Sequence, residues 1–548
     1  MDAQFDGLPE FTGPLDEAIL TRMANEFFAA LPGEPASLDG HTSAAAPEPD
    51  IAASPAPTAA TVLSNVPDSL EDAAITIHAP PHHEAAPVLG VQQPAAVRPT
   101  GPGDMPADPY APSRGAEFYF INPLIQQSVT VPVTRASSPA PFDVEAVRRD
   151  FPILTEQVNG HQLIWLDNAA TTQKPRQVID RLSRFYAHEN SNIHRAAHEL
   201  AARSTDAYED ARAKVARFLG APSSEDIIFV RGTTEAINLV AQSWGRTNIR
   251  GGDEIVISYL EHHANIVPWQ LLAEEVGAAL RVIPVDDCGQ IILDEYRRLL
   301  TNRTRLVAVA HVSNALGTVL PLPEVIGPAH NVGARVLIDG AQAVSHMPVD
   351  VQALDADFYA FSGHKVFGPT GIGALYGKSD VLDSMPPWHG GGNMIRNVTF
   401  ERTVYQPPPT RFEAGTTSIA DAVGLGPALD YVERIGRANI ASYEHDLLSY
   451  ATQALADVPG LRLVGTAPDK AGILSFVLDG YQPEDVGSAL NESGIAVRAG
   501  HHCAQPILRR YGLAATVRAA LAMYNTYSEV DQLAAALHRL AAQPGTPP

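Results

Sequence analysis

Lysine and cysteine, two residue types that can act as nucleophiles in enzymes, are rare in this 548-residue chain. A lysine amine can form an imine with a carbonyl compound, and a cysteine thiolate can attack an electrophilic atom. The chain has two cysteines, Cys288 and Cys503. Its five lysines are Lys174, Lys214, Lys365, Lys378 and Lys470. Only Lys365 directly follows the pattern of a buried strand.

Lys365 lies in the run DFYAFSGHKVFGPTG, in which Ser362, His364 and Lys365 leave the strand end together. A lysine that forms an imine must stand on a rigid element and be partly desolvated. The glycines that follow allow a ligand to approach the backbone closely. The four residues SGHK are a weak signal by themselves, because a lysine on a loop is usually solvated.

Cys503 lies in the run AVRAGHHCA, beside His501 and His502 and after a strand and a glycine. Neighbouring histidines and an exposed loop are typical of a thiol with a lowered pKa and good access. The alternative is a small buried apolar residue, which describes most free cysteines. We apply that alternative to Cys288, which lies in the turn 286–289.

Asp339 follows the expected strand 335–338 and precedes Gly340. The carboxyl end of a buried strand points toward the crevice where open α/β sheets bind ligands. There an aspartate can keep the pyridine nitrogen of pyridoxal phosphate protonated, which makes the ring an electron sink. A lone aspartate after a strand more often caps the next helix.

Gly232, Thr233 and Thr234 precede a helical pattern. A glycine and two hydroxyls at a helix N-terminus form an anion site suited to a phosphate, although a plain N-cap is the simpler interpretation. His262 and His263 follow the strand 254–258, and His262 can stack on a cofactor ring or move protons. No carboxylate or cysteine stands at ligand spacing from this pair, so we predict no metal site.

The elements that position these residues are predicted from apolar patterns. Strands are expected at 226–230, 254–258, 305–311, 335–339, 357–361 and 372–376, with helices between several of them, such as 235–244 and 264–276. This alternation predicts an α/β fold with a mainly parallel sheet. Later come helices at 427–458, 484–493 and 527–542 and strands at 461–464, 472–478 and 495–498. We therefore expect a large domain over 141–426 and a smaller α+β domain over 427–548.

Residues 1–140 differ in composition from the rest, with 21 of the 45 prolines and no lysine or cysteine. Such a segment cannot bury enough apolar surface to offset its ordering entropy, so we predict a disordered extension. Two islands interrupt it: 14–30, with an amphipathic helical pattern, and the aromatic 117–124. These islands are expected to dock on a partner, or alternatively to pack weakly on the main body.

The net charge of −24 argues against binding to nucleic acid or to an anionic membrane surface. No apolar run approaches the roughly 20 residues of a membrane span, and no secretory signal is visible at the N-terminus. Two cysteines cannot form a disulfide framework, which fits a cytoplasmic protein.

The motifs together resemble the aminotransferase class V family, and within it the SufS-like cysteine desulfurases. The resemblance covers nearly all of residues 142–548. It rests on LDNAATTQKP (166–175), RGTTEAINLVAQSWG (231–245), EHHANIVPWQ (261–270), HVSNALGT (311–318), DGAQAV (339–344), SGHKVFGPTGIG (362–373), RFEAGT (411–416) and AVRAGHHCAQP (496–506). It implies pyridoxal phosphate as cofactor, the fold type I of enzymes that depend on it, and a role for each matching residue.

Lys365 would hold the cofactor covalently and later move a proton. Cys503 would attack the sulfur of L-cysteine, release alanine and keep a persulfide. The resemblance also implies contacts with the cofactor: Asp339 with the pyridine nitrogen, Gln342 with the ring hydroxyl, His262 by stacking on the ring, and Thr233, Thr234, Ser362 and His364 with the phosphate. Thr416 would reach the phosphate of the neighbouring subunit in a homodimer. Asn314 and Arg518 would bind the substrate carboxylate, and Arg498 would lie beside the catalytic cysteine.

The loop around Cys503 is short, as in the SufS-like branch, so a separate sulfur-acceptor protein is expected to approach it. The extension 1–140 departs from ordinary family members. It resembles the cargo-loading segment of desulfurases packaged in encapsulin shells, which implies a place inside such a compartment in the cytoplasm. The alternatives are an arm that recruits the acceptor, or an unselected linker.

Three rival functions remain at this stage. Selenocysteine lyase uses the same residues, and the sequence does not separate it from cysteine desulfurase. Other reactions of the family, such as transamination or epimerisation, need no nucleophilic cysteine, so Cys503 argues against them. A non-catalytic scaffold that docks through 1–140 is disfavoured by the intact set Lys365, Asp339, His262 and Cys503.

Overall fold

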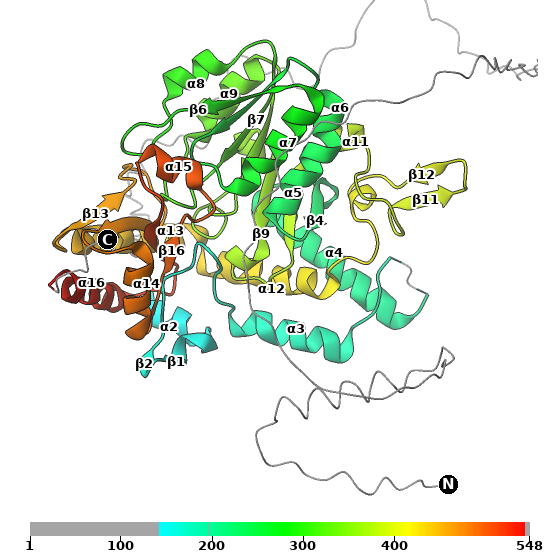
Figure 1. Ribbon diagram of the computed structural model, residues 1–548. Helices are drawn as coiled ribbons and strands as arrows, with labels where there is room; N and C mark the ends of the chain where they lie inside the picture. Colours follow the sequence, from blue (N-terminus) through cyan, green and yellow to red (C-terminus); the bar gives the residue numbers. More distant parts are fainter. Residues whose placement is uncertain (1–141, 195–196, 543–548) are drawn as a thin grey trace, which may run out of the picture. The chain divides into compact units, whose positions relative to one another are not determined.

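The computed structural model describes residues 142–194 and 197–542 (Figure 1). The extension predicted to be disordered, with its islands 14–30 and 117–124, lies outside the described residues. In the described part, no helix is both long enough and apolar enough to cross a membrane.

A seven-stranded sheet forms the centre of the larger part of the fold. Its strands in spatial order are β4 (Ile227–Val230), β10 (Gly373–Gly377), β9 (Phe358–Ser362), β8 (Arg335–Asp339), β7 (Thr304–Ala310), β5 (Glu254–Ser258) and β6 (Ala279–Ile283). Only β10 runs antiparallel to its neighbours, and all the other pairs are parallel. The mainly parallel sheet predicted from the sequence is therefore confirmed.

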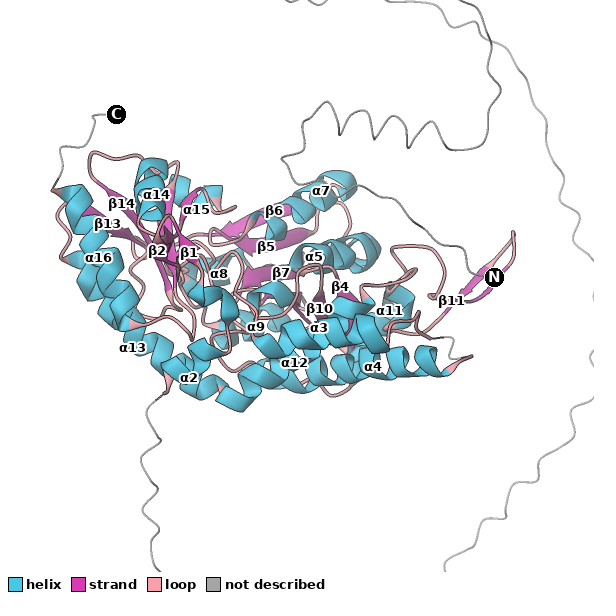
Figure 2. Cartoon of the chain, turned by 90° about the horizontal axis from the view of Figure 1, so that it is seen from below, coloured by secondary structure: helices cyan, strands magenta, loops and turns pink. Residues whose placement is uncertain are grey.

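Both faces of this sheet are buried, which explains why its strands read as continuous apolar runs. In β8, Val336 and Ile338 pack into one core cluster while Leu337 packs into another on the opposite face. Helices α3, α4 and α12 lie along one face, and α5 and α7 lie along the other (Figure 2). The sheet is thus held rigidly, and so are the side chains at its strand ends.

The helices of the described residues follow the predicted pattern with a few differences. They are α2 (Val144–Arg149), α3 (Arg176–His188), α4 (Glu199–Leu219), α5 (Thr233–Val240), α6 (Arg246–Asn248), α7 (Val267–Val276), α8 (Leu293–Leu299), α9 (Leu322–Asn331), α10 (Val351–Leu354), α11 (Ser379–Ser384), α12 (Ile419–Ile435), α13 (Arg437–Ala456), α14 (Pro483–Glu492), α15 (Gln505–Arg510) and α16 (Tyr527–Ala541). The single helix predicted over 427–458 is two helices, because Gly436 has a φ of +92° and ends α12.

A second, antiparallel sheet follows the order β13 (Leu461–Val464), β14 (Ile473–Leu478), β17 (Thr516–Ala520) and β16 (Arg498–Gly500). Residues of α13, α14 and α16 pack with this sheet in a core of their own. The strand predicted over 495–498 is two strands, because β15 (Ile495–Ala496) pairs instead with β3 (Ile164–Trp165). The start of the described chain therefore packs with its C-terminal part. The boundary predicted after residue 426 falls inside α12.

Two short hairpins complete the described fold. One consists of β1 (Gln157–Val158) and β2 (His161–Gln162), and the other of β11 (Ile395–Val398) and β12 (Thr403–Tyr405). The second hairpin projects away from the body of the protein in both views (Figures 1 and 2).

Candidate active site

The carboxyl ends of β7, β8 and β9 meet the loop between β16 and α15 around a cavity of about 470 Å³. All but one of the residues predicted for the site line this cavity. They are Thr233, Thr234, His262, Asn314, Asp339, Gln342, Ser362, His364, Lys365, Arg498, Cys503 and Arg518. Segments almost 300 residues apart in the sequence thus share one cavity. The exception is Thr416, which is exposed on a segment outside it.

Lys365 ends a short 3-10 turn, η5 (Gly363–Lys365), that directly follows the buried strand β9. The turn is fixed from behind, because the Thr172 N–H donates to the His364 carbonyl at 3.0 Å. Burial lowers the pKa of the Lys365 amine to about 8, although the nearby Asp339 carboxylate favours its charged form. A useful fraction of this amine is therefore neutral and nucleophilic near neutral pH.

Asp339 is the last residue of β8 and is 6% exposed. Its Oδ1 accepts a hydrogen bond from the Ala341 N–H at 3.0 Å. The turn that follows is packed closely, because a Cβ on Gly340 would lie 2.1 Å from the ring of Tyr359. Burial raises the pKa of the Asp339 carboxyl, and the adjacent Lys365 opposes this shift. The carboxylate is thus held firmly in the cavity wall.

Gln342 lies one turn beyond Asp339 and is 3% exposed. Its Nε2 donates to the Ala169 carbonyl at 2.6 Å, which fixes the side-chain amide at the edge of the cavity.

His262 has an uncharged ring that is fixed in place. Its Nδ1 accepts from the Ala264 N–H at 3.0 Å, so the proton of the neutral ring is on Nε2. Burial, aided by the positive charge of Lys365, lowers the pKa of His262 to about 3. A neutral, oriented imidazole is suited to stacking on a planar ligand.

Glu261 is a buried neighbour of His262 that sequence reasoning missed as a functional residue. It accepts hydrogen bonds from Ser258 Oγ at 2.5 Å and from Asn265 Nδ2 at 2.6 Å. Burial raises the pKa of its carboxyl to about 8. Glu261 thereby ties together the two ends of the turn that carries His262.

The start of helix α5 forms a hydroxyl-rich corner of the cavity. Ser362 Oγ accepts from the Thr233 N–H at 2.9 Å and lies 2.9 Å from Thr233 Oγ1. Thr234 and His364 line the same corner. Burial lowers the pKa of His364 to about 4, with Lys365 acting in the same direction. Backbone N–H groups and hydroxyls at a helix N-terminus are suited to bind a phosphate.

The opposite side of the cavity is basic. Arg518 on β17 is 2% exposed and donates through Nη1 to the Asn314 carbonyl at 2.8 Å. Asp167 pairs with both Arg518, at 3.3 Å, and Arg498, at 2.9 Å. Burial lowers the pKa of Arg518 to about 10, against the opposing charge of Asp167. Sequence reasoning gave no role to Asp167, although it stands within the first quoted motif.

Asn314 Oδ1 and Arg518 Nε are two of three buried polar atoms of cavity-lining residues that have no hydrogen-bond partner among the described residues, the third being His502 Nδ1. The Asn314 Nδ2 donates to the His502 carbonyl at 2.7 Å, which aligns the Asn314 amide. A buried group without a partner is costly, so these atoms indicate where a polar ligand belongs.

Cys503 is exposed and lies on a constrained loop. The backbone φ angles of His502 and Cys503 are +52° and +53°, a left-handed conformation that few residues other than glycine adopt. The Cys503 N–H donates to His501 Nδ1 at 3.0 Å, and the Cys503 carbonyl accepts from the His263 N–H at 2.7 Å. Contacts on both sides therefore hold the thiol at the mouth of the cavity.

The two histidines before Cys503 differ in their surroundings. His502 is buried, with Nε2 against Thr516 Oγ1 at 2.9 Å, and burial lowers its pKa to about 3. His501 is exposed beside Cys503. Of the pair that the sequence placed near the thiol, His501 alone hydrogen bonds to Cys503.

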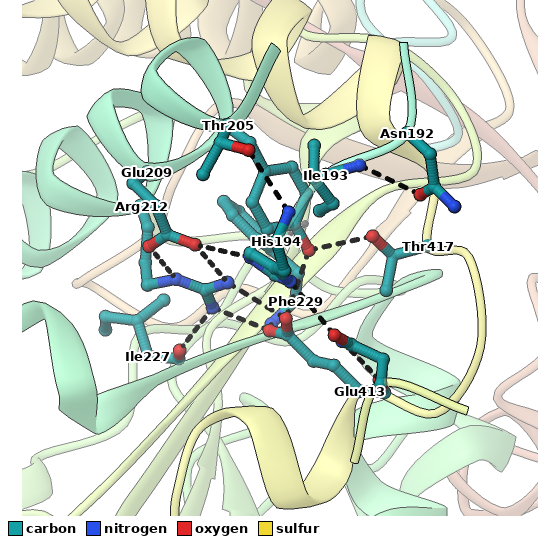
Figure 3. Close-up of polar contacts among 12 residues, drawn as sticks. Asn192, Ile193, His194, Thr205, Glu209, Arg212, Ile227, Phe229, Glu413 and Thr417 are labelled. Atoms are coloured by element: carbon teal, nitrogen blue, oxygen red, sulfur yellow. Dashed lines mark hydrogen bonds and ion pairs between the residues drawn. The ribbon is translucent and has the colours of Figure 1, made fainter. Parts of the chain in front are cut away.

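The segment that carries Thr416 is anchored by a polar network whose inner members, Arg212 and Glu413, are buried (Figure 3). Glu413 is buried and pairs with Arg212 at 2.6 Å. Arg212 also contacts Glu209, and Glu209 contacts His194 at 3.1 Å. The network fixes the chain just before Thr416, so that this exposed threonine is presented on a rigid base.

Comparison with known proteins identifies the family. Residues 164–533 match the model of the aminotransferase class V family. The chain belongs to that family. It is 54% identical to a cysteine desulfurase from Synechococcus elongatus over 96% of this chain and 89% of the relative. It is also 54% identical to a cysteine desulfurase from Escherichia coli, over 73% of this chain and 98% of that one.

Solved structures agree with this assignment. The cysteine desulfurase CsdA from Escherichia coli, in an S-sulfonic acid form, has a TM-score of 0.67 and 42% identity over 73% of this chain and 98% of its own. The apo cysteine desulfurase from Thermococcus onnurineus has a TM-score of 0.69 and 38% identity over 72% of this chain and 98% of its own. A third structure, with glycine covalently linked to its PLP cofactor, has 23% identity and shares the fold, with a TM-score of 0.62.

The cofactor of this family is pyridoxal phosphate, and the cavity fits it. Lys365 forms no hydrogen bond or ion pair with any residue of the described ranges, so its amine is available for a covalent bond. Asp339 would hold the pyridine nitrogen, His262 would cover the ring, and the Thr233 corner would hold the phosphate. The unpartnered Asn314 and Arg518 atoms then remain for a substrate.

Proposed function

We propose that this protein, a cysteine desulfurase that depends on pyridoxal phosphate, removes sulfur from L-cysteine with Lys365 as the proton carrier and Cys503 as the sulfur acceptor. The observation that supports this most directly is that Lys365, Asp339 and Cys503 line one cavity. An ordinary aminotransferase reaction has no use for a thiol at this place.

Each residue has a task that its surroundings permit. Arg518 binds the carboxylate of L-cysteine through its unpartnered Nε–H. Asn314 binds it through its Nδ2 amide, which must first release the His502 carbonyl. These contacts orient Cα toward Lys365. The amine of Lys365, with a pKa near 8 before the cofactor binds, removes the Cα proton and returns a proton to carbon later. When bound, pyridoxal phosphate supplies the electron sink for the pair left by that proton.

Cys503 then performs the sulfur transfer. Its thiolate attacks the sulfur of the substrate, an S–S bond forms, and the C–S bond breaks with its electron pair remaining on carbon. Protonation of that carbon gives alanine, and the sulfur stays on Cys503 as a persulfide. The loop contacts from His263 and His501 hold the Cys503 backbone during this step.

The test compares Cys503→Ala, Lys365→Ala and Cys288→Ser on L-cysteine, with alanine as the measured product. Loss of alanine formation is expected in the first two variants, and Cys288→Ser should match the unchanged enzyme. Full activity of Cys503→Ala on L-cysteine would contradict the proposal. If Cys503→Ala acts on selenocysteine but not on L-cysteine, the result fits both a desulfurase and a selenocysteine lyase. The ratio of kcat/KM for the two substrates in the unchanged enzyme then decides between these two functions.

A separate acceptor protein completes the proposal. Only four residues, 501–504, lie between β16 and α15, so the Cys503 thiol cannot move far. The acceptor must therefore approach Cys503 at the mouth of the cavity. A small protein with an exposed thiol should raise turnover above the rate with a small thiol alone. Equal rates with both would argue against a protein acceptor.

We also propose a homodimer in which Thr416 reaches the phosphate of the neighbouring subunit. Its support is that Thr416 is exposed and rigidly presented, yet lies outside the cavity of its own chain. Thr416→Ala should lower the affinity for pyridoxal phosphate without loss of dimer mass in light scattering. Unchanged cofactor affinity would remove Thr416 from the phosphate site.

The extension 1–140 is proposed to load the enzyme into an encapsulin shell. Residues 1–141 are about a quarter of the chain, so the match over 96% of it to the Synechococcus relative includes most of them. The Escherichia coli relative matches 73%. The extension is therefore shared by some relatives and missing from the matches of others.

Residues 1–140 fused to a fluorescent protein should be captured when a shell protein of this type is co-expressed, and deletion of 14–30 or 117–124 should weaken that capture. Capture of a small thiol protein instead would make the extension an arm that recruits the sulfur acceptor. Absence of both would leave the desulfurase assignment unchanged and remove the cargo proposal.

A further inference from the structure

Three side chains with metal-ligating atoms meet at the mouth of the cavity. They are His263, His501 and Cys503, and one ligand atom of each lies within 4.8 Å of the others. His263 begins η4 (His263–Asn265), whereas the other two stand about 240 residues later, on the loop before α15. Sequence spacing places no cysteine near the histidine pair at 262–263, so the cluster is a product of the fold.

The backbone holds this cluster together before any ligand arrives. The His263 N–H donates to the Cys503 carbonyl at 2.7 Å. The rings of His263 and His501 are stacked, with centroids 5.7 Å apart and an angle of 29° between their planes. The His263 Nε2 accepts a hydrogen bond from the Gln505 N–H at 3.2 Å, so this ring nitrogen carries a lone pair.

We propose that His263, His501 and Cys503 bind a zinc ion that reversibly blocks the sulfur-transfer thiol. Zinc prefers imidazole and thiolate ligands such as these, whereas hard ions such as Mg²⁺ or Ca²⁺ prefer oxygen ligands. Three protein ligands leave a fourth position for water, as in zinc sites that stay open. While zinc occupies the thiolate of Cys503, that sulfur cannot attack the substrate.

The geometry makes this a site of moderate affinity. In a tetrahedral zinc site the bonds are roughly 2.0–2.3 Å long, so the three ligand atoms must move closer together than in this structure, where they lie within 4.8 Å of one another. His501 and Cys503 are exposed, so their side chains are free to turn inward. Each ring also accepts a backbone N–H: His501 Nδ1 from Cys503, and His263 Nε2 from Gln505 at 3.2 Å.

Zinc binding must displace those hydrogen bonds or change the tautomers of both rings. Zinc therefore competes with contacts that position the loop in the working enzyme. We therefore expect zinc to act here as a reversible inhibitor and not as a tightly bound structural ion.

The inhibition rests on the proposed function, so the first experiment measures binding without catalysis. The holoenzyme, dialysed against a chelator, is alkylated at its thiols with and without Zn²⁺, and Cys503 is followed by peptide mass with Cys288 as internal reference. Zn²⁺ should slow alkylation of Cys503 at least about fivefold at saturation, because a zinc-bound thiolate is a poorer nucleophile, and should leave the rate at Cys288 unchanged.

The variants His263→Ala and His501→Ala decide whether the histidines take part. Each should raise the Zn²⁺ concentration needed for protection by about tenfold, which corresponds to the loss of about 1.4 kcal/mol of binding. The matched control is His445→Ala, an exposed histidine on α13, which should behave like the unchanged enzyme. Equal protection in all four proteins would mean that the thiol alone binds the ion, and the proposal would be overturned.

A second measurement uses Co²⁺ in place of Zn²⁺. A thiolate and two imidazoles around Co²⁺ should give visible absorption at longer wavelengths than the cofactor, and this absorption should disappear in Cys503→Ala. If Zn²⁺ protects Cys503 but the enzyme shows no desulfurase activity, the zinc site stands and the proposed function fails. If activity is present but protection is absent, only the zinc site fails.

Discussion

Lys365 and Cys503 line the same cavity but are held in opposite ways. Lys365 follows a central strand of a sheet that is buried on both faces, and its amine is desolvated enough to lower its pKa to about 8. Cys503 stands exposed on a loop with two left-handed residues. A proton carrier needs a fixed distance and a dry environment, whereas a sulfur carrier must be reached from outside. The two regions are built for these two tasks.

The largest expected effect comes from removing the amine on the rigid side. Lys365→Ala should lower kcat by about 10²–10⁴ or more, the usual contribution of a positioned acid or base. The loss should persist with small-thiol acceptors, because the proton step precedes sulfur transfer. Alanine formation under single-turnover conditions measures it. A Lys365→Ala enzyme that regained normal rates with excess thiol would place the limiting role of Lys365 elsewhere.

A second test concerns Asp167, which links the two sides by pairing with buried Arg518 and half-exposed Arg498. Asp167→Asn leaves Arg518 without its counter-charge, so the free energy of unfolding should fall by about 1–3 kcal/mol. KM for L-cysteine should also rise, because Arg518 becomes less well placed. Urea denaturation and steady-state kinetics measure the two effects. The control is Asp287→Asn, whose carboxylate pairs with Arg510 at the surface and should contribute less than 1 kcal/mol.

The third prediction uses the lowered pKa of Lys365 in the apoenzyme. An amine with a pKa of about 8 in the folded state and 10.5 in the unfolded state destabilises the fold at pH 7. Lys365→Met should therefore raise the free energy of unfolding of the apoenzyme at pH 7, by a figure on the order of 3 kcal/mol. This gain should shrink as the pH rises from about 8 to 10.5, since the folded amine has then lost its proton.

The control for that prediction is Lys214, which pairs with Asp210 and Asp430 and whose pKa these contacts raise against the effect of burial. Lys214→Met should lower the stability at pH 7, the opposite sign. Denaturant titrations of the apo forms across this pH range measure both. A gain for Lys365→Met that does not change with pH would mean that apolar packing, and not the amine's charge, is responsible.

The sequence predicted the rigid region better than the exposed one. All six predicted strands of the large sheet are present, because each is a largely apolar run that is buried in the fold. The seventh, β6, was missed because its pattern is partly exposed, and β17 was missed because Arg518 interrupts it. Residue type and position after strands already indicated Lys365, Cys503 and Asp339 as candidates, but Gln342, Asn314, Arg498 and Arg518 came only from the motif resemblance, because no periodicity places such distant residues together.

What the sequence did not reveal lies in contacts between distant segments. Asp167 binds two arginines more than 330 residues away, and Glu261 acts through its burial, which no local pattern reports. The approach of His263 to Cys503 depends on how the small sheet packs against the large one. The disorder of 1–140, its docking islands and the dimer role of Thr416 remain predictions.

The smallest expected effect tests the strain on the exposed side. Cys503 has a φ of +53°, where any side chain with a Cβ costs roughly 1–2 kcal/mol relative to glycine. Glycine elsewhere lowers stability by about 0.5–1 kcal/mol through its unfolded-state entropy. The two terms nearly offset, so Cys503→Gly should be about 0.5 kcal/mol more stable than Cys503→Ala, which reverses the usual order. Urea denaturation of the two inactive variants measures this difference. If alanine is the more stable by 1 kcal/mol or so, the loop relaxes without its thiol, and the left-handed backbone is maintained by the Cys503 side chain and not by its neighbours.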